Sequence, residues 1–108
     1  MERTSYCGAP RVEDAGRELV LAGWVDSRRD HGGIIFVDLR DHTGVVQLVF
    51  DPEISAAAHT TAGELRSEFV ISVKGKLRGR TPETINPRMD TGKVELEVHE
   101  LEVLNVSK

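Results

Sequence analysis

Alternation of apolar and polar residues with a period of two dominates the chain, and this feature restricts its fold more than any other. It is clearest in residues 69–80, where Phe69, Ile71, Val73 and Leu77 alternate with polar and charged residues. Side chains along a strand point to alternate faces, so the pattern predicts strands with one buried face. We expect five strands, over residues 19–29, 34–40, 45–50, 69–80 and 94–104.

Turn residues separate the predicted strands. Gly32-Gly33 can supply the positive φ angles of a two-residue hairpin, and Asp41 to Gly44 forms a second turn signal. Asp51-Pro52 indicates a helix start, with aspartate as the cap and proline at the first helical position. We therefore expect a helix over residues 53–68. Residues 81–92, which carry two prolines, are expected to form a loop.

Three strands, a helix and two further strands are the element order of the five-stranded OB-fold barrel. A half-open α+β sheet has the same order and is the alternative. Gly23, Gly75 and Gly79 lie inside predicted strands and favour the barrel, because its corners need residues without a side chain. The expected fold class is all-β, a five-stranded OB-fold barrel with one helix between strands 3 and 4. Residues 1–108 are expected to form this single domain.

No signature of catalysis or membrane insertion accompanies these strands. The single cysteine excludes an internal disulfide and suits a reducing cytoplasm, and no apolar run approaches the ~20 residues of a membrane helix. A phosphate-binding glycine loop and a metal-spaced Cys/His set are both missing. We therefore expect a cytoplasmic domain without catalytic residues, metal or cofactor.

The charge of the chain argues mildly against a nonspecific nucleic-acid coat protein, because the formal net charge at pH 7 is −4. A nucleic-acid-binding chain of this composition must gather its positive charge on one face. Alternation predicts such a face, since Lys74, Lys76, Arg78 and Arg80 form one row. The same row is also typical of an ordinary solvated strand face.

An aromatic ring and an amide are predicted to share one outer face. Phe36 and Gln47 both alternate with core residues, on the second and third strands, where OB barrels bind oligonucleotides. An exposed ring can stack on a base, and an amide can hydrogen-bond a base edge. Arg28 and Arg29, beside the first turn, can hold phosphates. Together these residues favour a single-stranded nucleic-acid site.

Each of these features also has a purely structural explanation. A single outward phenylalanine can be covered by a loop or helix, and the two arginines can form ion pairs with Asp26 or Asp30. Two other function classes therefore stay open: a general single-strand nucleic-acid-binding module, and an OB domain that binds only protein. Binding to unrelated oligonucleotides distinguishes the first, and failure to bind any RNA the second.

Four segments resemble one known family. The stretch AGWVDSRRDHGGIIFVDLRDHTGVVQLVFDPE, with RTSYCG, LRSEFVISVKGKLRGR and INPRMDTGKVELEV, is similar to the N-terminal anticodon-binding domain of bacterial-type aspartyl-tRNA synthetases. The resemblance implies part of a class II aspartate–tRNA ligase, whose ATP and Mg²⁺ sites belong to a separate C-terminal catalytic domain expected beyond this chain. It also implies a homodimeric parent enzyme, whereas we expect the isolated domain to be a monomer.

The resemblance further implies which residues bind the anticodon of tRNA(Asp). Phe36 would stack on the middle base, a uracil, and Gln47 would hydrogen-bond the same base. Arg29 would contact the bases or the backbone near the turn, and Glu95 would approach the third base. The remaining implied contacts are Arg28, His31, Arg66, Arg80, Thr84 and Asn86.

Glu95 and His31 indicate different tRNA specificities. A carboxylate accepts a hydrogen bond from the N4 amine of cytosine but repels O4 of uracil, so Glu95 favours the aspartate anticodon, which ends in C. His31, however, stands where discriminating relatives tend to carry leucine, and DHGG resembles enzymes that charge both tRNA(Asp) and tRNA(Asn). We therefore expect a non-discriminating parent enzyme. Ser27, where many relatives carry arginine, and the TPETIN loop depart from the family pattern.

Overall fold

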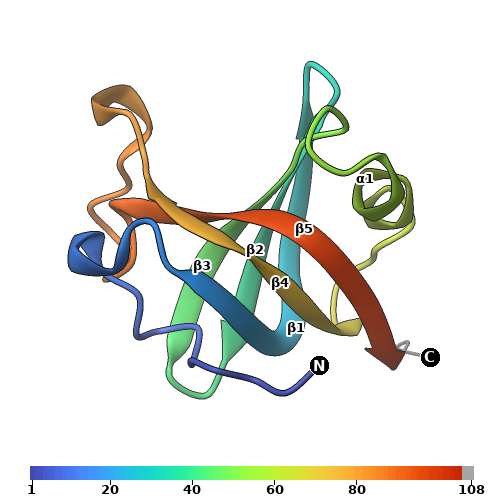
Figure 1. Ribbon diagram of the computed structural model, residues 1–108, viewed down its shortest axis with the longest axis horizontal. Helices are drawn as coiled ribbons and strands as arrows, with labels where there is room; N and C mark the ends of the chain where they lie inside the picture. The colour runs from blue at the N-terminus through green and yellow to red at the C-terminus, as the bar shows by residue number, and fades with distance from the viewer. Residues whose placement is uncertain (106–108) are drawn as a thin grey trace.

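A computed structural model describes residues 1–105, which form a closed five-stranded barrel (Figure 1). Its elements are η1 (Val12–Asp14), β1 (Glu18–His31), β2 (Ile34–Asp41), β3 (Gly44–Phe50), α1 (Ala56–Ala62), β4 (Val70–Gly79), η2 (Pro82–Thr84) and β5 (Val94–Asn105). The strand order is β1-β2-β3-β5-β4, and β1 pairs with β4 to close the barrel. The all-β OB-fold prediction is confirmed and the half-open sheet is excluded. Residues 106–108 of the predicted domain lie outside the described residues.

The side chains predicted to face inward form the barrel core. They are Ile35, Val37 and Leu39 of β2, Val46, Leu48 and Phe50 of β3, Ile71, Val73 and Leu77 of β4, and Val94, Leu96 and Val98 of β5, all at most 2% exposed. Full burial of each such side chain stabilises the fold by roughly 1.5–3 kcal/mol, relative to leaving the side chain exposed. Phe69 differs from the prediction, because it precedes β4 and is only partly buried against the core.

Two of the three strand glycines allow close backbone approach. A Cβ atom at Gly75 would collide with the carbonyl oxygen of Glu97, and one at Gly23 would collide with that of Arg40. Gly75 also lies where the register between β4 and β5 shifts. A Cβ at Gly79 would meet no atom closer than 3.9 Å, so its role in a barrel corner is not supported.

The helix is much shorter than the predicted range of 53–68. Its cap is Ser55, whose hydroxyl accepts a hydrogen bond from the Ala58 amide, and Gly63 is the C-cap. The Asp51 carboxylate instead accepts a hydrogen bond from the amide two residues ahead, which forms a turn. The predicted start was wrong because an Asp-Pro pair suits such a turn as well as a helix cap.

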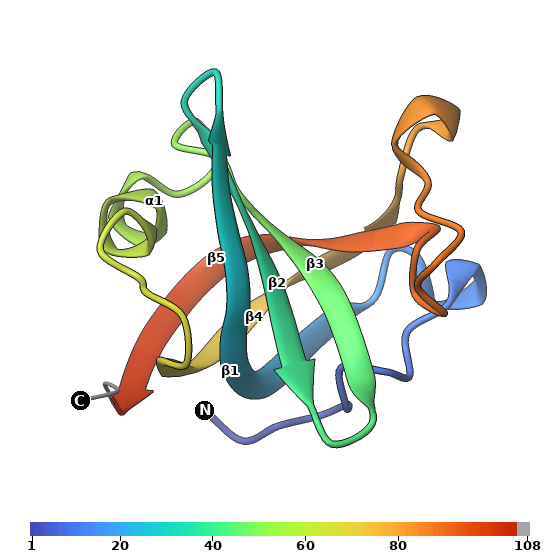
Figure 2. The same cartoon turned by 180° about the vertical axis from the view of Figure 1, so that it is seen from behind.

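The β1–β2 hairpin extends beyond the barrel at the end that α1 covers (Figures 1 and 2). Gly32 and Gly33 have φ angles of 61° and 88°, which confirms the predicted two-residue turn. His59 of α1 lies 2.6 Å, through its Nε2, from the carbonyl oxygen of Gly33. The ring must donate in this hydrogen bond, so the hairpin tip is tied to the helix. Within residues 1–105, no helix is long and apolar enough to cross a membrane.

Candidate nucleic-acid interface

One open hollow of about 530 Å³ lies on the outer face of the barrel. All five strands and the start of the β4–β5 connection contribute to it. Its lining consists of Arg29, His31, Ile34, Phe36, Gln47, Val49, Arg78, Gly79, Arg80, Thr81, Thr84 and Glu95. We call it the base hollow, because its size and lining suit planar, partly polar ligands.

The barrel register places five polar residues in one row, and three of them, Gln47, Glu95 and Arg78, line the base hollow. Ser27 of β1 pairs with Asp38 of β2, and Asp38 pairs with Gln47 of β3. Gln47 pairs in turn with Glu95 of β5, and Glu95 pairs with Arg78 of β4. Directly paired residues point to the same face, so these five side chains form one row across the outer face of the barrel.

A bulge in β1 decides which arginine joins this row. The register against β2 shifts between Val25 and Ser27, which makes Asp26 an extra residue. After the bulge, Arg29 pairs with Phe36 on the outer face, whereas Arg28 pairs with the core residue Val37. Arg29 therefore enters the base hollow, and Arg28 points to the other side of the strand.

Phe36 provides an aromatic surface in the hollow, as predicted. Its ring is half-buried and lies 6.0 Å from the ring of His31, at an interplanar angle of 65°. Ile34 and Val49 line the same hollow, and Val49 is the buried partner of Phe36 on β3. A half-buried ring above an apolar floor, in an open hollow, suits the stacking of an unpaired base.

Gln47 is buried and hydrogen-bonded at both ends of its amide. Its Oε1 accepts from the Arg29 guanidinium at 3.0 Å, and its Nε2 donates to Glu95 at 2.9 Å. Arg29 also donates to Asp38 at 3.2 Å and to Ser27 at 3.1 Å. Ser27 thus supports the site by contacting Arg29 and Asp38.

Glu95 is held by a second network on β4 and β5. Arg78 donates through Nε to Glu95 and through an NH group to Glu97, both at 2.9 Å. His99 lies 2.9 Å from the other Glu97 oxygen. The His99 hydrogen bond, together with Arg78, lowers the pKa of Glu97 despite its partial burial. The Glu97 carboxylate, which shares Arg78 with Glu95, is therefore stabilised in its charged form.

Arg80 and Thr84 form the wall next to the β4–β5 connection. The Arg80 guanidinium donates to the carbonyl oxygens of Val94 and Thr84, each at 3.0 Å. Burial lowers the pKa of Arg80, although Glu95 and Asp38 oppose the shift by their negative charge. Arginine keeps its charge even so, and this cation is held against the hollow by backbone groups.

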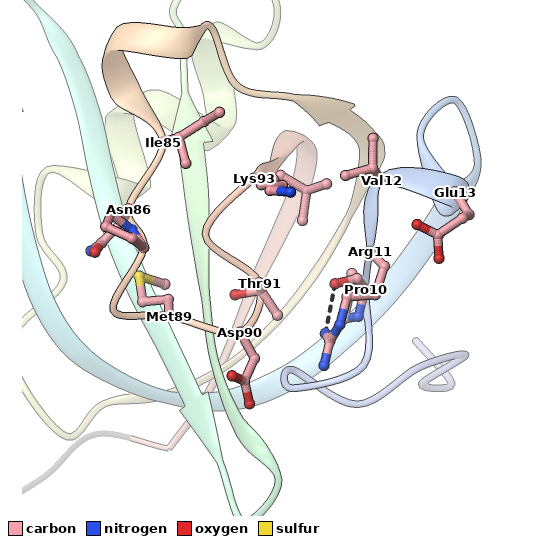
Figure 3. A pocket seen from close by; sticks show the side chains of 12 residues that line it. Pro10, Arg11, Val12, Glu13, Ile85, Asn86, Met89, Asp90, Thr91 and Lys93 are labelled. Carbon is pink, nitrogen blue, oxygen red and sulfur yellow. Dashed lines mark hydrogen bonds between the residues drawn. The ribbon is translucent and has the colours of Figure 1, made fainter.

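Seven of the ten predicted site residues line the base hollow: Arg29, His31, Phe36, Gln47, Arg80, Thr84 and Glu95. Arg28 and Arg66 line a separate hollow of about 430 Å³ with Leu65 and Ser67. Asn86 lies in a third place, a groove between the β4–β5 connection and the segment from Pro10 to Glu13 (Figure 3). Its Oδ1 accepts a hydrogen bond from the Arg88 amide, within its own loop.

Arg78, Ile34 and Val49 line the hollow but were not among the predicted site residues. Alternation already placed Arg78 on the outer face of its strand and Ile34 beside Phe36, so their faces were available from sequence. Their convergence on one site depends on which strands are neighbours, and the sequence does not state the register between them.

Lys74, Lys76 and Arg78 share the outer face of β4 as predicted, but the positive charge of the row is partly neutralised. Lys74 lies 3.6 Å from Glu18 and 3.7 Å from Glu100, and Arg78 binds two carboxylates. Acidic side chains of neighbouring strands therefore neutralise two of the four residues of the row, Lys74 and Arg78. The alternative ion pairs of the first turn are wrong, because Arg29 pairs with Asp38, and Asp26 pairs with Arg40.

Comparison with known proteins places these features in a family context. Residues 19–104 match the tRNA anticodon family, described as an OB-fold nucleic acid binding domain. The chain is 58% identical over 106 residues to Aspartate–tRNA(Asp/Asn) ligase of Brachyspira hyodysenteriae. It is 49% identical over 108 residues to Aspartate–tRNA ligase of Geobacillus kaustophilus. These matches cover 98% and 100% of the chain but only 18% of each relative's length.

A solved structure agrees with this assignment. The asparaginyl-tRNA synthetase from Pyrococcus horikoshii superposes with a TM-score of 0.82 at 29% sequence identity. The superposition covers 100% of this chain and 23% of that one. In length, therefore, the chain corresponds to one domain of these much longer proteins.

Proposed function

The chain belongs to the tRNA anticodon family of OB-fold nucleic-acid-binding domains, and from this premise we propose that the base hollow binds the anticodon loop of a tRNA. The observation that carries the proposal is the arrangement of Phe36 and Gln47. A half-buried ring and a hydrogen-bonded amide lie on neighbouring strands of one hollow. Proteins recognise single-stranded RNA loops by stacking bases on rings and hydrogen-bonding their edges.

The finer proposal concerns the parent protein and its tRNA. We propose that the domain serves an aspartate–tRNA ligase acting in the cytoplasm, whose ATP and Mg²⁺ sites lie in its catalytic domain. tRNA(Asp) is the proposed partner, with the middle uracil at Phe36 and Gln47. The Asp/Asn name of the Brachyspira relative and His31 support tRNA(Asn) as a second partner.

The test measures binding of the chain to an anticodon stem-loop of tRNA(Asp) by isothermal titration calorimetry. Changing the middle uracil should weaken binding, and Phe36→Ala should weaken it by about 1–3 kcal/mol because the stacking surface is lost. Phe36→Leu is the matched control, since it keeps an apolar side chain and removes only the ring. A loop whose third base is U instead of C tests tRNA(Asn).

Three outcomes separate the function classes. Preference for the middle uracil, lost with the ring, supports anticodon recognition. Equal binding of unrelated oligonucleotides would indicate a general single-strand binder, although the ion pairs of Lys74 and Arg78 disfavour this class. Unchanged NMR spectra on addition of every RNA would leave only a protein-binding or structural role.

A further inference from the structure

We propose that Arg78 is a positioning residue that fixes Glu95, and through Glu95 fixes the orientation of the Gln47 amide. Gln47 would then present its remaining donor and acceptor to a base in one order only. This inference rests on the proposed function and adds a cause for its base selectivity.

Hydrogen-bond chemistry allows the Gln47 amide a single orientation. A guanidinium can only donate, so the group 3.0 Å from Arg29 must be the amide oxygen. An ionised carboxylate can only accept, so the group 2.9 Å from Glu95 must be the amide nitrogen. Rotating the amide by half a turn would oppose donor to donor and acceptor to acceptor. Gln47 is only 7% exposed, so water could compensate little of that loss.

Glu95 can hold the amide only if its own carboxylate is fixed. One Glu95 oxygen accepts from Gln47, and the other accepts from Arg78 Nε. Arg78 is the direct partner of Glu95 across β4 and β5, and it also donates to Glu97. The guanidinium thus joins two carboxylates as a planar fork, which a lysine ammonium cannot reproduce.

The fixed amide keeps one N–H and one lone pair for a ligand. On its Watson–Crick edge, uracil offers the acceptor O4 next to the donor N3–H. On the same edge, cytosine offers the donor N4–H next to the acceptor N3. An amide held in one orientation can match one of these orders in a given stacked pose. An amide free to rotate can match both. Loss of Arg78 should therefore reduce discrimination more than affinity.

The first measurement uses the free protein. Gln47 is the only glutamine of the chain, so selective ¹⁵N labelling of glutamine side chains separates its NH₂ signals from those of the two asparagines, Asn86 and Asn105. In the unmodified protein we expect two well-separated signals with slow hydrogen exchange. In Arg78→Ala, and in Arg78→Lys, we expect them to move toward the positions of a solvated amide and to exchange faster.

The second measurement compares stem-loops that carry U or C at the middle position. The ratio of their dissociation constants should fall by about tenfold in Arg78→Ala, the scale of a lost base-edge contact. Arg78→Lys keeps the positive charge and should restore affinity without restoring the ratio. Lys76→Ala is the matched control: Lys76 is an exposed cation of the same strand, without a side-chain partner among residues 1–105. It should leave both measurements unchanged.

Unchanged Gln47 signals and an unchanged U/C ratio in both Arg78 variants, with stem-loop binding intact, would overturn the positioning role alone. Altered amide signals with an unchanged ratio would also overturn it, because the fixed orientation would then not govern base choice. If the unmodified protein bound neither stem-loop, the proposed function and this inference would both be wrong. The amide signals would still report whether Arg78 orders Gln47 in the free protein.

Discussion

Asp41 connects the N-terminal segment to the barrel through one carboxylate. It accepts a hydrogen bond from the Cys7 amide at 2.8 Å, and from the Thr43 amide and hydroxyl at 2.8 and 2.6 Å. Burial raises the pKa of Asp41, but these hydrogen bonds outweigh burial and hold the pKa below its ordinary value of 3.8. The charged form of this side chain therefore stabilises the fold.

Asp41→Asn should lower the free energy of unfolding at pH 7 by about 1–3 kcal/mol, because an amide cannot accept all these bonds. The folded pKa lies below the unfolded one, so the contribution of Asp41 is complete above about pH 4. It is lost as the pH falls through the folded pKa. The stability difference between the two proteins should therefore shrink below pH 4 in urea unfolding followed by circular dichroism.

The control for this prediction is Asp26→Asn. Asp26 forms an exposed ion pair with Arg40 at 3.3 Å, which stabilises by less than about 1 kcal/mol. A difference between Asp41→Asn and the unmodified protein that stayed constant from pH 7 to pH 2.5 would show that the Asp41 charge does not stabilise the fold.

At the scale of elements, the strands could be predicted because their alternation is local. The inward residues of β2 to β5 follow a period of two, and Gly32-Gly33 marks its own turn. The helix start was missed because Asp51-Pro52 and Ser55 are both acceptable caps, and the choice depends on how the connection meets the barrel. The side of Arg29 could not be predicted, since simple alternation from Val25 places Arg28 on the outer face instead.

Gly75→Ala should destabilise the barrel by about 1–3 kcal/mol, because the added methyl group meets backbone of β5 that cannot move aside. Gly79→Ala is the matched control on the same strand, and there we expect a change below about 0.5 kcal/mol. Both can be measured by urea unfolding followed through Trp24, the only tryptophan. Equal effects at the two glycines would contradict the proposed close approach of β4 and β5.

At the scale of the whole molecule, the arginines near the proposed RNA-binding face lie in two separate hollows. In the base hollow, Arg29 and Arg78 are paired with carboxylates. Arg28 and Arg66, which share the separate hollow, are exposed and have no side-chain hydrogen bond or ion pair within residues 1–105. This division could not be predicted from the sequence, where Arg28 and Arg29 are adjacent and look equivalent. It suggests that base choice and phosphate attraction reside on different sides of β1.

Arg28→Ala and Arg66→Ala should each weaken stem-loop binding without changing the preference for the middle uracil. Each lost phosphate contact should reduce the slope of log affinity against log salt by about 0.7. Titrations between 50 and 300 mM salt, with matched and mismatched loops, measure both quantities. Arg17→Ala, which removes an exposed arginine just before β1, is the control for the change in net charge. A changed base preference would instead place Arg28 or Arg66 among the base contacts.

The bulge at Asp26 also governs how this domain can change during evolution. Closing the bulge without removing a residue, so that Asp26 paired with Asp38, would shift the rest of β1 by one position and exchange the sides of Arg28 and Arg29. Loss of Asp26 itself would instead restore a regular ladder and keep both arginines on their present sides. When homologues are aligned, a one-residue gap at Asp26 therefore leaves the RNA-facing arginine unchanged.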